Sequence, residues 1–303
     1  MRHINGFIAA PFSPMHENGT LNTGLVRSYA EFYIRNEVDG AFICGTSGEG
    51  TLLTNPERKI LAEAWSRESP EHFKNIIHIG GPSMEESQAL AQHAMQIGAY
   101  GTAAMAPCFF KPKHIDQLVA YCAALAGETP GMPFYYYHIP ALSGVHFPMI
   151  EFMQAAAPEI PNLAGIKFTH ENLFDFSQCL QLDNRKFDIL HGQDETLLCG
   201  LVLGATGGVG GTYNHIMGIY RKIKNAFDAG NLIEARAYQE ISQKFIAILI
   251  KYGGNVIAGK RMMKFLGLDC GPNRIPIRNL TAEEEKRMKR ELHDIGFFEF
   301  ANT

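Results

Sequence analysis

The sequence predicts a (β/α)8 TIM barrel of the α/β class, followed by a helical appendage. Short apolar runs that end in turn residues recur eight times over the first two thirds of the chain, and a helix fits between each pair. The runs are apolar on both faces, as parallel strands under crossover helices require. The predicted strands are 6–10, 40–44, 75–79, 101–105, 133–137, 163–168, 187–191 and 204–208.

Periodicity and capping residues predict the helices between these strands. Residues 22–36 place four apolar residues on one helical face: Leu25, Tyr29, Phe32 and Tyr33. Thr54 precedes a proline at the first helical position and predicts the start of a helix at 56–66. Ser83 and the glutamate three residues later fit a capping box before a helix at 87–97.

The remainder of the chain is predicted to be helical. Three stretches have helical apolar spacing: 216–228, 232–252 and 256–266. Thr-Ala-Glu-Glu at 281–284 opens a last, charged helix. Because no low-complexity linker intervenes, we expect a catalytic barrel at 1–214 and a C-terminal helical extension at 215–303 that packs on it.

Composition indicates a globular protein whose expected partners are small molecules. The 303 residues are 46% hydrophobic, and 27 Lys and Arg against 31 Asp and Glu give a formal net charge of −4. The sequence has no run of Lys and Arg that would favour binding to nucleic acid, and no apolar stretch is long enough for a membrane helix. The six cysteines are scattered without a C-x-x-C pair, and the apolar run at 7–10 is too short for a signal peptide. We therefore expect a cytoplasmic protein without disulfides.

Two other site types fit the sequence less well. A doubly wound sheet with residues 207–211 as its phosphate loop lacks the G-x-G-x-x-G spacing, and its glycine run comes last rather than first. The histidines at candidate metal positions fall singly: His78, His138, His170, His191 and His215. We expect neither a metal nor a cofactor.

In a TIM barrel the chemistry lies at the carboxyl ends of the strands. That rule leaves a small set of candidate side chains: Thr46, Ser47, Glu49, Tyr137, His138, Lys167, Thr169, Asp194 and Glu195. The eighth strand contributes mainly glycine backbone.

Lys167 is the most informative of these residues. It lies among apolar and small neighbours in the sixth strand, beside the strand that ends at Tyr137. A lysine at a strand end commonly extends to solvent, and that alternative stays open here. Apolar surroundings disfavour the ammonium form, and a neutral lysine amine forms Schiff bases with carbonyls. We therefore predict that Lys167 points into the barrel mouth as a nucleophile.

A hydroxyl-rich turn follows the second strand, in Gly-Thr-Ser-Gly-Glu-Gly at 45–50. Such a turn can direct N–H and O–H groups at a small anion, although it is also an ordinary strand-to-helix connection. Beside a Schiff-base lysine, Thr46 and Ser47 predict a carboxylate pocket next to an electrophilic carbonyl. A 2-keto acid such as pyruvate carries both groups on adjacent carbons.

Two further groups complete the predicted site. Strand alternation places Tyr135 and Tyr137 on one face and Tyr136 on the other, with Tyr137 nearest the mouth. Its phenol can pass a proton between the bound carboxylate and a substrate oxygen. Asp194 and Glu195 are either solvated loop charges or hydrogen-bond acceptors for a polyhydroxylated substrate.

Four motifs in order resemble the N-acetylneuraminate lyase group of the dihydrodipicolinate synthase and pyruvate-aldolase family. The first three are Gly-Thr-Ser-Gly-Glu at 45–49, Tyr-His-Ile-Pro-Ala-Leu-Ser-Gly at 137–144 and Gly-Ile-Lys-Phe-Thr at 165–169. The fourth is Gly-Gln-Asp-Glu at 192–195, followed by Gly-Ala-Thr-Gly-Gly-Val-Gly-Gly-Thr-Tyr-Asn at 204–214. The resemblance therefore covers the whole barrel.

This resemblance implies a Schiff-base aldolase, usually a homotetramer, that reversibly cleaves N-acetylneuraminate, a sialic acid, to N-acetylmannosamine and pyruvate. Carried over by motif, Lys167 forms the Schiff base and Tyr137 relays a proton. Thr46 and Ser47 hold the pyruvyl carboxylate. Four further residues bind the sugar hydroxyls: Thr169, Gly192, Asp194 and Glu195.

Departures from the family pattern bear on the substrate. The synthase pattern has Arg where this chain has Leu142, and Tyr in the loop that holds Phe109 and Phe110, so both departures disfavour the synthase. Lyases typically have Ser before Thr-Tyr-Asn, whereas this chain has Gly211, which lacks the hydroxyl that would meet the sugar tail. One lost hydrogen bond costs about 0.5–1.5 kcal/mol, and a water can partly replace it.

Three functions therefore stay open at the level of sequence. The first is a sialic acid lyase. The second is another pyruvate-dependent enzyme of the family: an aldolase for a keto-deoxy sugar acid or, with less support, dihydrodipicolinate synthase. The third is a barrel that binds keto acids without catalysis, because an enzyme fold can be reused.

Overall fold

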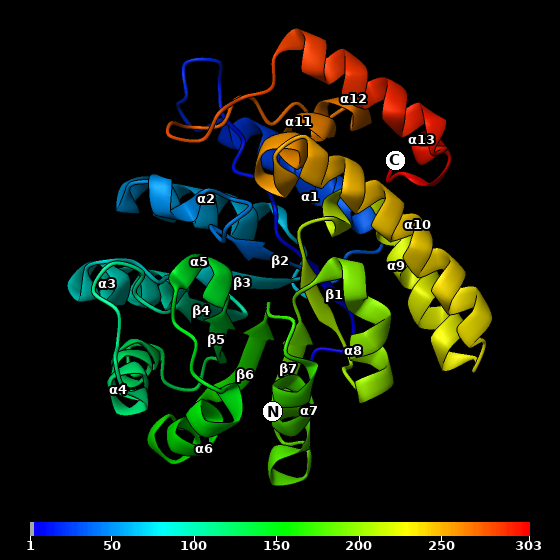
Figure 1. Ribbon diagram of the computed structural model, residues 1–303. Coiled ribbons are helices and arrows are strands. Elements are labelled where there is room, and N and C mark those ends of the chain that lie inside the picture. Colours follow the sequence, from blue (N-terminus) through cyan, green and yellow to red (C-terminus); the bar gives the residue numbers. More distant parts are fainter. Residues whose placement is uncertain (1–2) are drawn as a thin grey trace.

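A computed structural model, which describes residues 3–303, confirms the predicted barrel (Figure 1). Parallel strands β1 to β8 pair in sequence order, and β8 pairs with β1 to close the sheet. The strands are β1 (Phe7–Ala9), β2 (Gly40–Ile43), β3 (Lys74–His78), β4 (Gly101–Met105), β5 (Phe134–His138), β6 (Leu163–Phe168), β7 (Asp188–His191) and β8 (Gly208–Gly210).

Helices connect the strands and cover the outside of the barrel (Figure 1). Thr54 and Glu57 form the complete capping box at the start of the second α-helix, and Ser83 Oγ accepts the N–H of Glu86 at the start of the third. The α-helices up to the end of the barrel are α1 (Val26–Arg35), α2 (Asn55–Glu68), α3 (Met84–Gln96), α4 (Ile115–Ala126), α5 (Pro140–Ser143), α6 (Met149–Glu159), α7 (Leu173–Gln181), α8 (Leu197–Leu203) and α9 (Tyr213–Asp228). Short 3-10 turns are η1 (Thr23–Leu25), η2 (Gly50–Leu52), η3 (Leu182–Asn184) and η4 (Asp194–Thr196).

The predicted position of the eighth strand, 204–208, is wrong. Helix α8 continues to Leu203, and Gly204 ends it in the left-handed conformation with φ of 103°, as glycine commonly does after a helix. The strand begins only at Gly208. The glycine run is therefore a helix stop followed by a strand, and sequence pattern alone does not separate the two.

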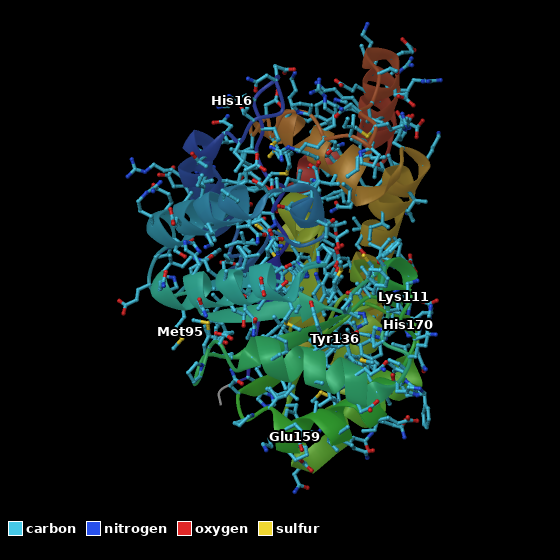
Figure 2. All side chains as sticks on the ribbon, turned by 90° about the vertical axis from the view of Figure 1, so that its left-hand side faces the viewer. His16, Met95, Lys111, Tyr136, Glu159 and His170 are labelled. Atoms are coloured by element: carbon cyan, nitrogen blue, oxygen red, sulfur yellow. The ribbon has the colours of Figure 1, made fainter. Side chains whose placement is uncertain are left out.

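Side chains of the strands alternate between two cores, as predicted for the fifth strand. Tyr135 and Tyr137 face the interior of the barrel, whereas Tyr136 belongs to the layer between the strands and the helices. The ring of Tyr136 lies 4.7 Å from that of Phe152 on α6, measured between centroids. Figure 2 shows the side chains on the ribbon, with Tyr136 labelled.

The C-terminal helices lie against one side of the barrel. They are α10 (Leu232–Lys251), the π-helical turn η5 (Asn255–Gly259), α11 (Lys260–Met263), the 3-10 turn η6 (Lys264–Leu266), α12 (Ala282–Asp294) and α13 (Phe297–Phe300). Helix α10 packs along α9, while α12 packs on α10 (Figure 1). A domain boundary between residues 214 and 215 stays a prediction. No helix within residues 3–303 is long and apolar enough to cross a membrane.

A buried ion pair joins this extension to the turn after β2. Lys260 Nζ lies 2.6 Å from Glu49 Oε1, and the two side chains are 1% and 0% exposed. Lys260 also donates to the carbonyl of Pro272, and the N–H of Arg274 donates to Glu49 Oε2. Both charges thus have hydrogen-bond partners, which a buried pair needs if it is not to destabilise the fold.

We expect Lys260→Met to lower the free energy of unfolding by about 3–5 kcal/mol, because it leaves the Glu49 carboxylate buried without its cation. Lys264→Met is the matched control: Lys264 and Asp269 form a pair whose side chains are 47% and 44% exposed. Breaking such a surface pair should cost less than about 1 kcal/mol. Urea unfolding followed by circular dichroism compares the two, and equal losses would contradict the role given to the buried pair.

Candidate active site

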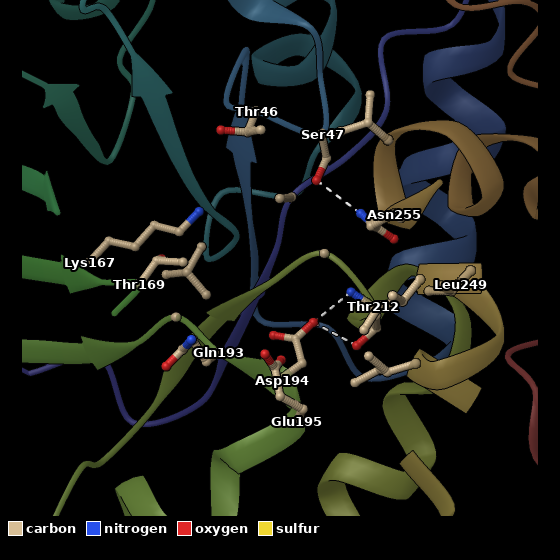
Figure 3. A pocket seen from close by; sticks show the side chains of 18 of the residues that line it. Thr46, Ser47, Lys167, Thr169, Gln193, Asp194, Glu195, Thr212, Leu249 and Asn255 are labelled. Atoms are coloured by element: carbon tan, nitrogen blue, oxygen red, sulfur yellow. Dashed lines mark hydrogen bonds between the residues drawn. The ribbon is translucent and has the colours of Figure 1, made fainter. Parts of the chain in front are cut away.

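One pocket at the carboxyl ends of the strands gathers most of the site residues predicted from the sequence (Figure 3). Its volume of about 340 Å³ suits a small-molecule ligand. The nine predicted residues that line it are Thr46, Ser47, Tyr137, Lys167, Thr169, Gly192, Asp194, Glu195 and Gly211. Two other candidates lie elsewhere: Glu49 is buried beside Lys260, and His138 packs against Phe168.

Lys167 extends from β6 into this pocket, as predicted (Figure 3). The residue is only 5% exposed, so its side chain does not run out to bulk solvent. Its Nζ lies 4.0 Å from the ring centroid of Tyr137 on the neighbouring strand and 4.2 Å from that of Phe42 on β2. The aromatic rings limit the access of water to the amine and leave the pocket as its open side.

The turn after β2 has an unusual backbone. Cys44 and Glu49, on either side of residues 45–48, are non-glycine residues with positive φ values of 58° and 53°. Such conformations persist only where the surrounding structure holds them, and Glu49 is held by its bonds to Lys260 and to the Arg274 N–H. The tail of the chain thereby stabilises the turn that carries Thr46 and Ser47.

Tyr137 links the lysine to this turn. Its phenol oxygen lies 3.3 Å from Thr46 Oγ1, and either oxygen can be the donor. Its ring packs edge-on against Phe42, with 5.4 Å between centroids, which fixes the direction of the phenol. A hydroxyl pair of this kind, next to a buried amine, can carry a proton between groups of a bound ligand.

Asp194 is buried rather than a solvated loop charge. It lies in η4, is 6% exposed, and its Oδ2 accepts hydrogen bonds from Thr212 N at 2.7 Å and Thr212 Oγ1 at 2.6 Å. Burial raises its pKa to about 6, while the bonds from Thr212 act in the opposite direction. Its carboxyl therefore changes charge close to neutral pH.

Glycine in β8 makes room for this carboxyl group. A Cβ built on Gly210 would lie 2.2 Å from Asp194 Oδ1. Within the described chain, Oδ1 of Asp194 and Oγ1 of Thr169 are both buried without a hydrogen-bond partner. Unpaired buried oxygens that belong to pocket residues are free to bond a ligand.

Sequence reasoning missed the contribution of the C-terminal extension to the pocket wall. The residues concerned come from the end of α10 and the start of η5: Ile246, Leu249, Ile250, Gly253, Gly254, Asn255 and Val256. A glycine pair breaks the helix there, with φ of 98° at Gly253 and 83° at Gly254. That pair, in an otherwise helical pattern, was the visible sign that the chain turns back toward the barrel.

The assembled groups fit one type of chemistry. A buried amine lies opposite hydroxyl groups that can bind a carboxylate, and a phenol stands between them. Such a pocket can hold a small 2-oxo acid with its carbonyl carbon at the amine, and amines react with carbonyls to form imines. The carboxyl groups of Asp194 and Glu195 lie farther along the same pocket (Figure 3).

Comparison with known proteins agrees with this geometry. Residues 3–295 match the dihydrodipicolinate synthetase family. The N-acetylneuraminate lyase of Rattus norvegicus is 39% identical over 303 residues, which is 99% of this chain and 95% of that protein. The Proteus mirabilis N-acetylneuraminate lyase superposes with a TM-score of 0.94 at 37% identity, covering 98% of this chain and 100% of the other. The N-acetylneuraminate lyase of Aliivibrio salmonicida superposes with a TM-score of 0.95 at 35% identity, covering 98% of each chain.

Proposed function

This chain belongs to the dihydrodipicolinate synthetase family, and we propose that it is a class I aldolase that reversibly cleaves N-acetylneuraminate to N-acetylmannosamine and pyruvate. The observation that carries the proposal is the buried amine of Lys167, which shares one pocket with the phenol of Tyr137 and the hydroxyls of Thr46 and Ser47. The lyase relatives support the choice of sugar acid.

The first step is imine formation. Thr46 and Ser47 bind the substrate carboxylate, which directs the adjacent carbonyl carbon toward Lys167. The neutral amine attacks that carbon and water leaves, so a C=N bond replaces the C=O bond. The rings of Phe42 and Tyr137, whose centroids lie 4.2 and 4.0 Å from Lys167 Nζ, hold the amine at the pocket where this carbon is bound.

The second step breaks the carbon–carbon bond. The hydroxyl group two carbons from the imine carbon loses its proton through Tyr137 to the bound carboxylate, and its carbon becomes the aldehyde of N-acetylmannosamine. The bond electrons move to the protonated imine, which becomes an enamine. The proton held by the carboxylate then passes to the enamine carbon and restores the protonated imine, and water releases pyruvate and the free lysine. The Thr46 Oγ1 to Tyr137 OH distance of 3.3 Å supports this role for the phenol.

The remaining pocket residues are proposed to bind the sugar portion. Asp194 and Glu195 accept hydrogen bonds from its hydroxyls, and Thr169 Oγ1 offers a further buried oxygen. Gly192 contributes through its backbone. A hydroxyl bound to a charged acceptor contributes about 1.5–3 kcal/mol, so these contacts discriminate strongly between sugars.

A second candidate function uses the same Schiff-base lysine but a different acceptor aldehyde. It is motivated by Gly211, where lyases typically carry the serine hydroxyl that meets the sugar tail. An aldolase for a keto-deoxy sugar acid would need fewer contacts there. Leu142 is 59% exposed and offers no positive charge for a second substrate carboxylate, which disfavours the synthase reaction.

The proposal includes a homo-oligomer, a tetramer by resemblance, in the cytoplasm. Phe109 and Phe110, in the loop after β4, are 81% and 86% exposed and stack edge-on with 4.9 Å between ring centroids. Two neighbouring aromatic side chains that are this exposed are typical of surfaces that become buried on association.

Borohydride reduction in the presence of pyruvate should label the peptide that contains Lys167 and inactivate the enzyme, because it converts the imine to a stable secondary amine. Lys167→Met should lower kcat for N-acetylneuraminate cleavage by about 10³-fold or more. Lys186→Met, at an exposed lysine just before β7, is the matched control and should keep both labelling and activity. Peptide mass mapping is the measurement, and labelling of another lysine would contradict the assignment.

Asp194 predicts a specific pH dependence. With its pKa raised to about 6, the carboxyl is largely protonated at pH 5 and ionised at pH 7.5, so kcat/KM for N-acetylneuraminate should rise through pH 6. Asp194→Asn should lack this rise and lose about 10- to 100-fold in kcat/KM at pH 7.5. Glu195→Gln should keep the rise. A pH profile of Asp194→Asn that parallels the wild type would overturn the interpretation.

Profiling aldehydes against pyruvate in the synthetic direction separates the two candidate substrates. A sialic acid lyase should condense N-acetylmannosamine at least about tenfold more efficiently than an unacetylated hexose. The unacetylated sugar loses a hydrogen bond and leaves polar groups of the pocket unpaired, and both effects weaken its binding. The measurement is kcat/KM for each aldehyde. A preference for the unacetylated sugar would favour the keto-deoxy sugar acid reaction.

A further inference from the structure

The side chain of Asn255 fills the space that a side chain at residue 211 would occupy. A Cβ built on Gly211 would lie 2.4 Å from Asn255 Nδ2, and a Cβ built on Gly259 would lie 2.4 Å from Asn255 Oδ1. Neither glycine has a positive φ, so the backbone conformation does not demand glycine at either place. A side chain at either place would have to displace the Asn255 amide, which is enclosed between two glycines from different parts of the chain.

The enclosed amide contacts the turn that carries the carboxylate-binding hydroxyls. Asn255 Nδ2 donates a hydrogen bond to Ser47 Oγ at 3.1 Å, across 208 positions of sequence (Figure 3). Both residues line the pocket, and Ser47 is 8% exposed. The contact therefore lies at the wall where we place the keto-acid carboxylate.

The direction of this hydrogen bond matters for the ligand. A serine hydroxyl has a single proton and two lone pairs. Because the amide donates to Ser47 Oγ, that oxygen acts as acceptor toward Asn255 and keeps its own proton for another group. A carboxylate has only acceptor oxygens, so it needs a hydroxyl that is oriented to donate.

We propose that Asn255 is a positioning residue that orients Ser47 to bind the carboxylate of the keto acid, and that residue 211 is glycine because the Asn255 amide takes its place. This inference rests on the proposed function, since it assumes a keto-acid carboxylate at Ser47. At the place where lyases typically have the hydroxyl of a serine at residue 211, this chain thus has the Asn255 amide, which is bonded to Ser47. A serine introduced at 211 displaces the amide and weakens carboxylate binding.

The test measures pyruvate binding alone, through the pyruvate concentration that gives half-maximal borohydride trapping at Lys167. Asn255→Ala should raise this concentration about three- to tenfold, the effect of one lost hydrogen bond. Asn255→Asp should raise it further, because a carboxylate of the same size cannot donate and repels the ligand. Gly211→Ser should match Asn255→Ala. At saturating pyruvate the trapping rate of each variant should stay within about twofold of wild type, since the amine itself is unchanged.

Double mutation and a glycine control make the test specific. Gly211→Ser combined with Asn255→Ala should be no worse than either single change, because both act through the same amide. A Cβ added to Gly218, on α9, would meet no atom within 4 Å, so Gly218→Ser should leave trapping unchanged. Circular dichroism melting confirms that each variant is folded before it is compared.

The outcomes distinguish this inference from the proposed function. Unchanged half-maximal pyruvate concentrations in both Asn255→Ala and Asn255→Asp would overturn the inference, as would additive effects of the Gly211 and Asn255 changes. A wild-type protein that traps pyruvate but does not cleave N-acetylneuraminate would refute the proposed substrate and leave the role of Asn255 to be decided by the trapping data. A wild-type protein that traps no pyruvate would refute both.

Discussion

The buried ion pair between Glu49 and Lys260 is the interaction on which the geometry of the pocket depends. It joins the turn after β2 to the C-terminal extension, and both charges have the hydrogen-bond partners that burial requires. Glu49 itself has a left-handed backbone at the end of that turn. The turn therefore keeps its hydroxyl groups in place through a contact with a part of the chain that begins more than two hundred residues later.

A second buried polar side chain, Asn214, connects the segment after β8 to the end of β1. Asn214 is fully buried, and its amide donates to the carbonyls of Ala10 and Gly211. Its oxygen accepts from the phenols of Tyr29 and Tyr33 at 2.5 Å each. All four bonds that an asparagine side chain can make are satisfied, so burial carries no penalty for an unpaired group. The backbone at Gly211 is thereby fixed relative to β1.

Burial also governs the charged and reactive groups in and around the pocket. The group that bonds the ligand covalently is the amine of Lys167, which lies within 4.2 Å of two aromatic ring centroids in a largely buried part of the barrel. Two buried carboxyl groups near the pocket have partners of their own: Glu49 pairs with Lys260, and Asp194 is bonded to Thr212. The low local polarity strengthens each interaction with a bound substrate.

The sequence by itself determined the barrel, the strand that carries Lys167 and the alternation that turns Tyr137 toward the mouth. These follow from apolar periodicity and turn residues, which act within a few positions along the chain. Only the tertiary structure decided that Asp194 is buried against Thr212, that β8 starts at Gly208, and that Asn255 lies between Gly211 and Gly259 and donates to Ser47. Such contacts join side chains that are distant in sequence, and their existence depends on how whole elements pack, which no local pattern records.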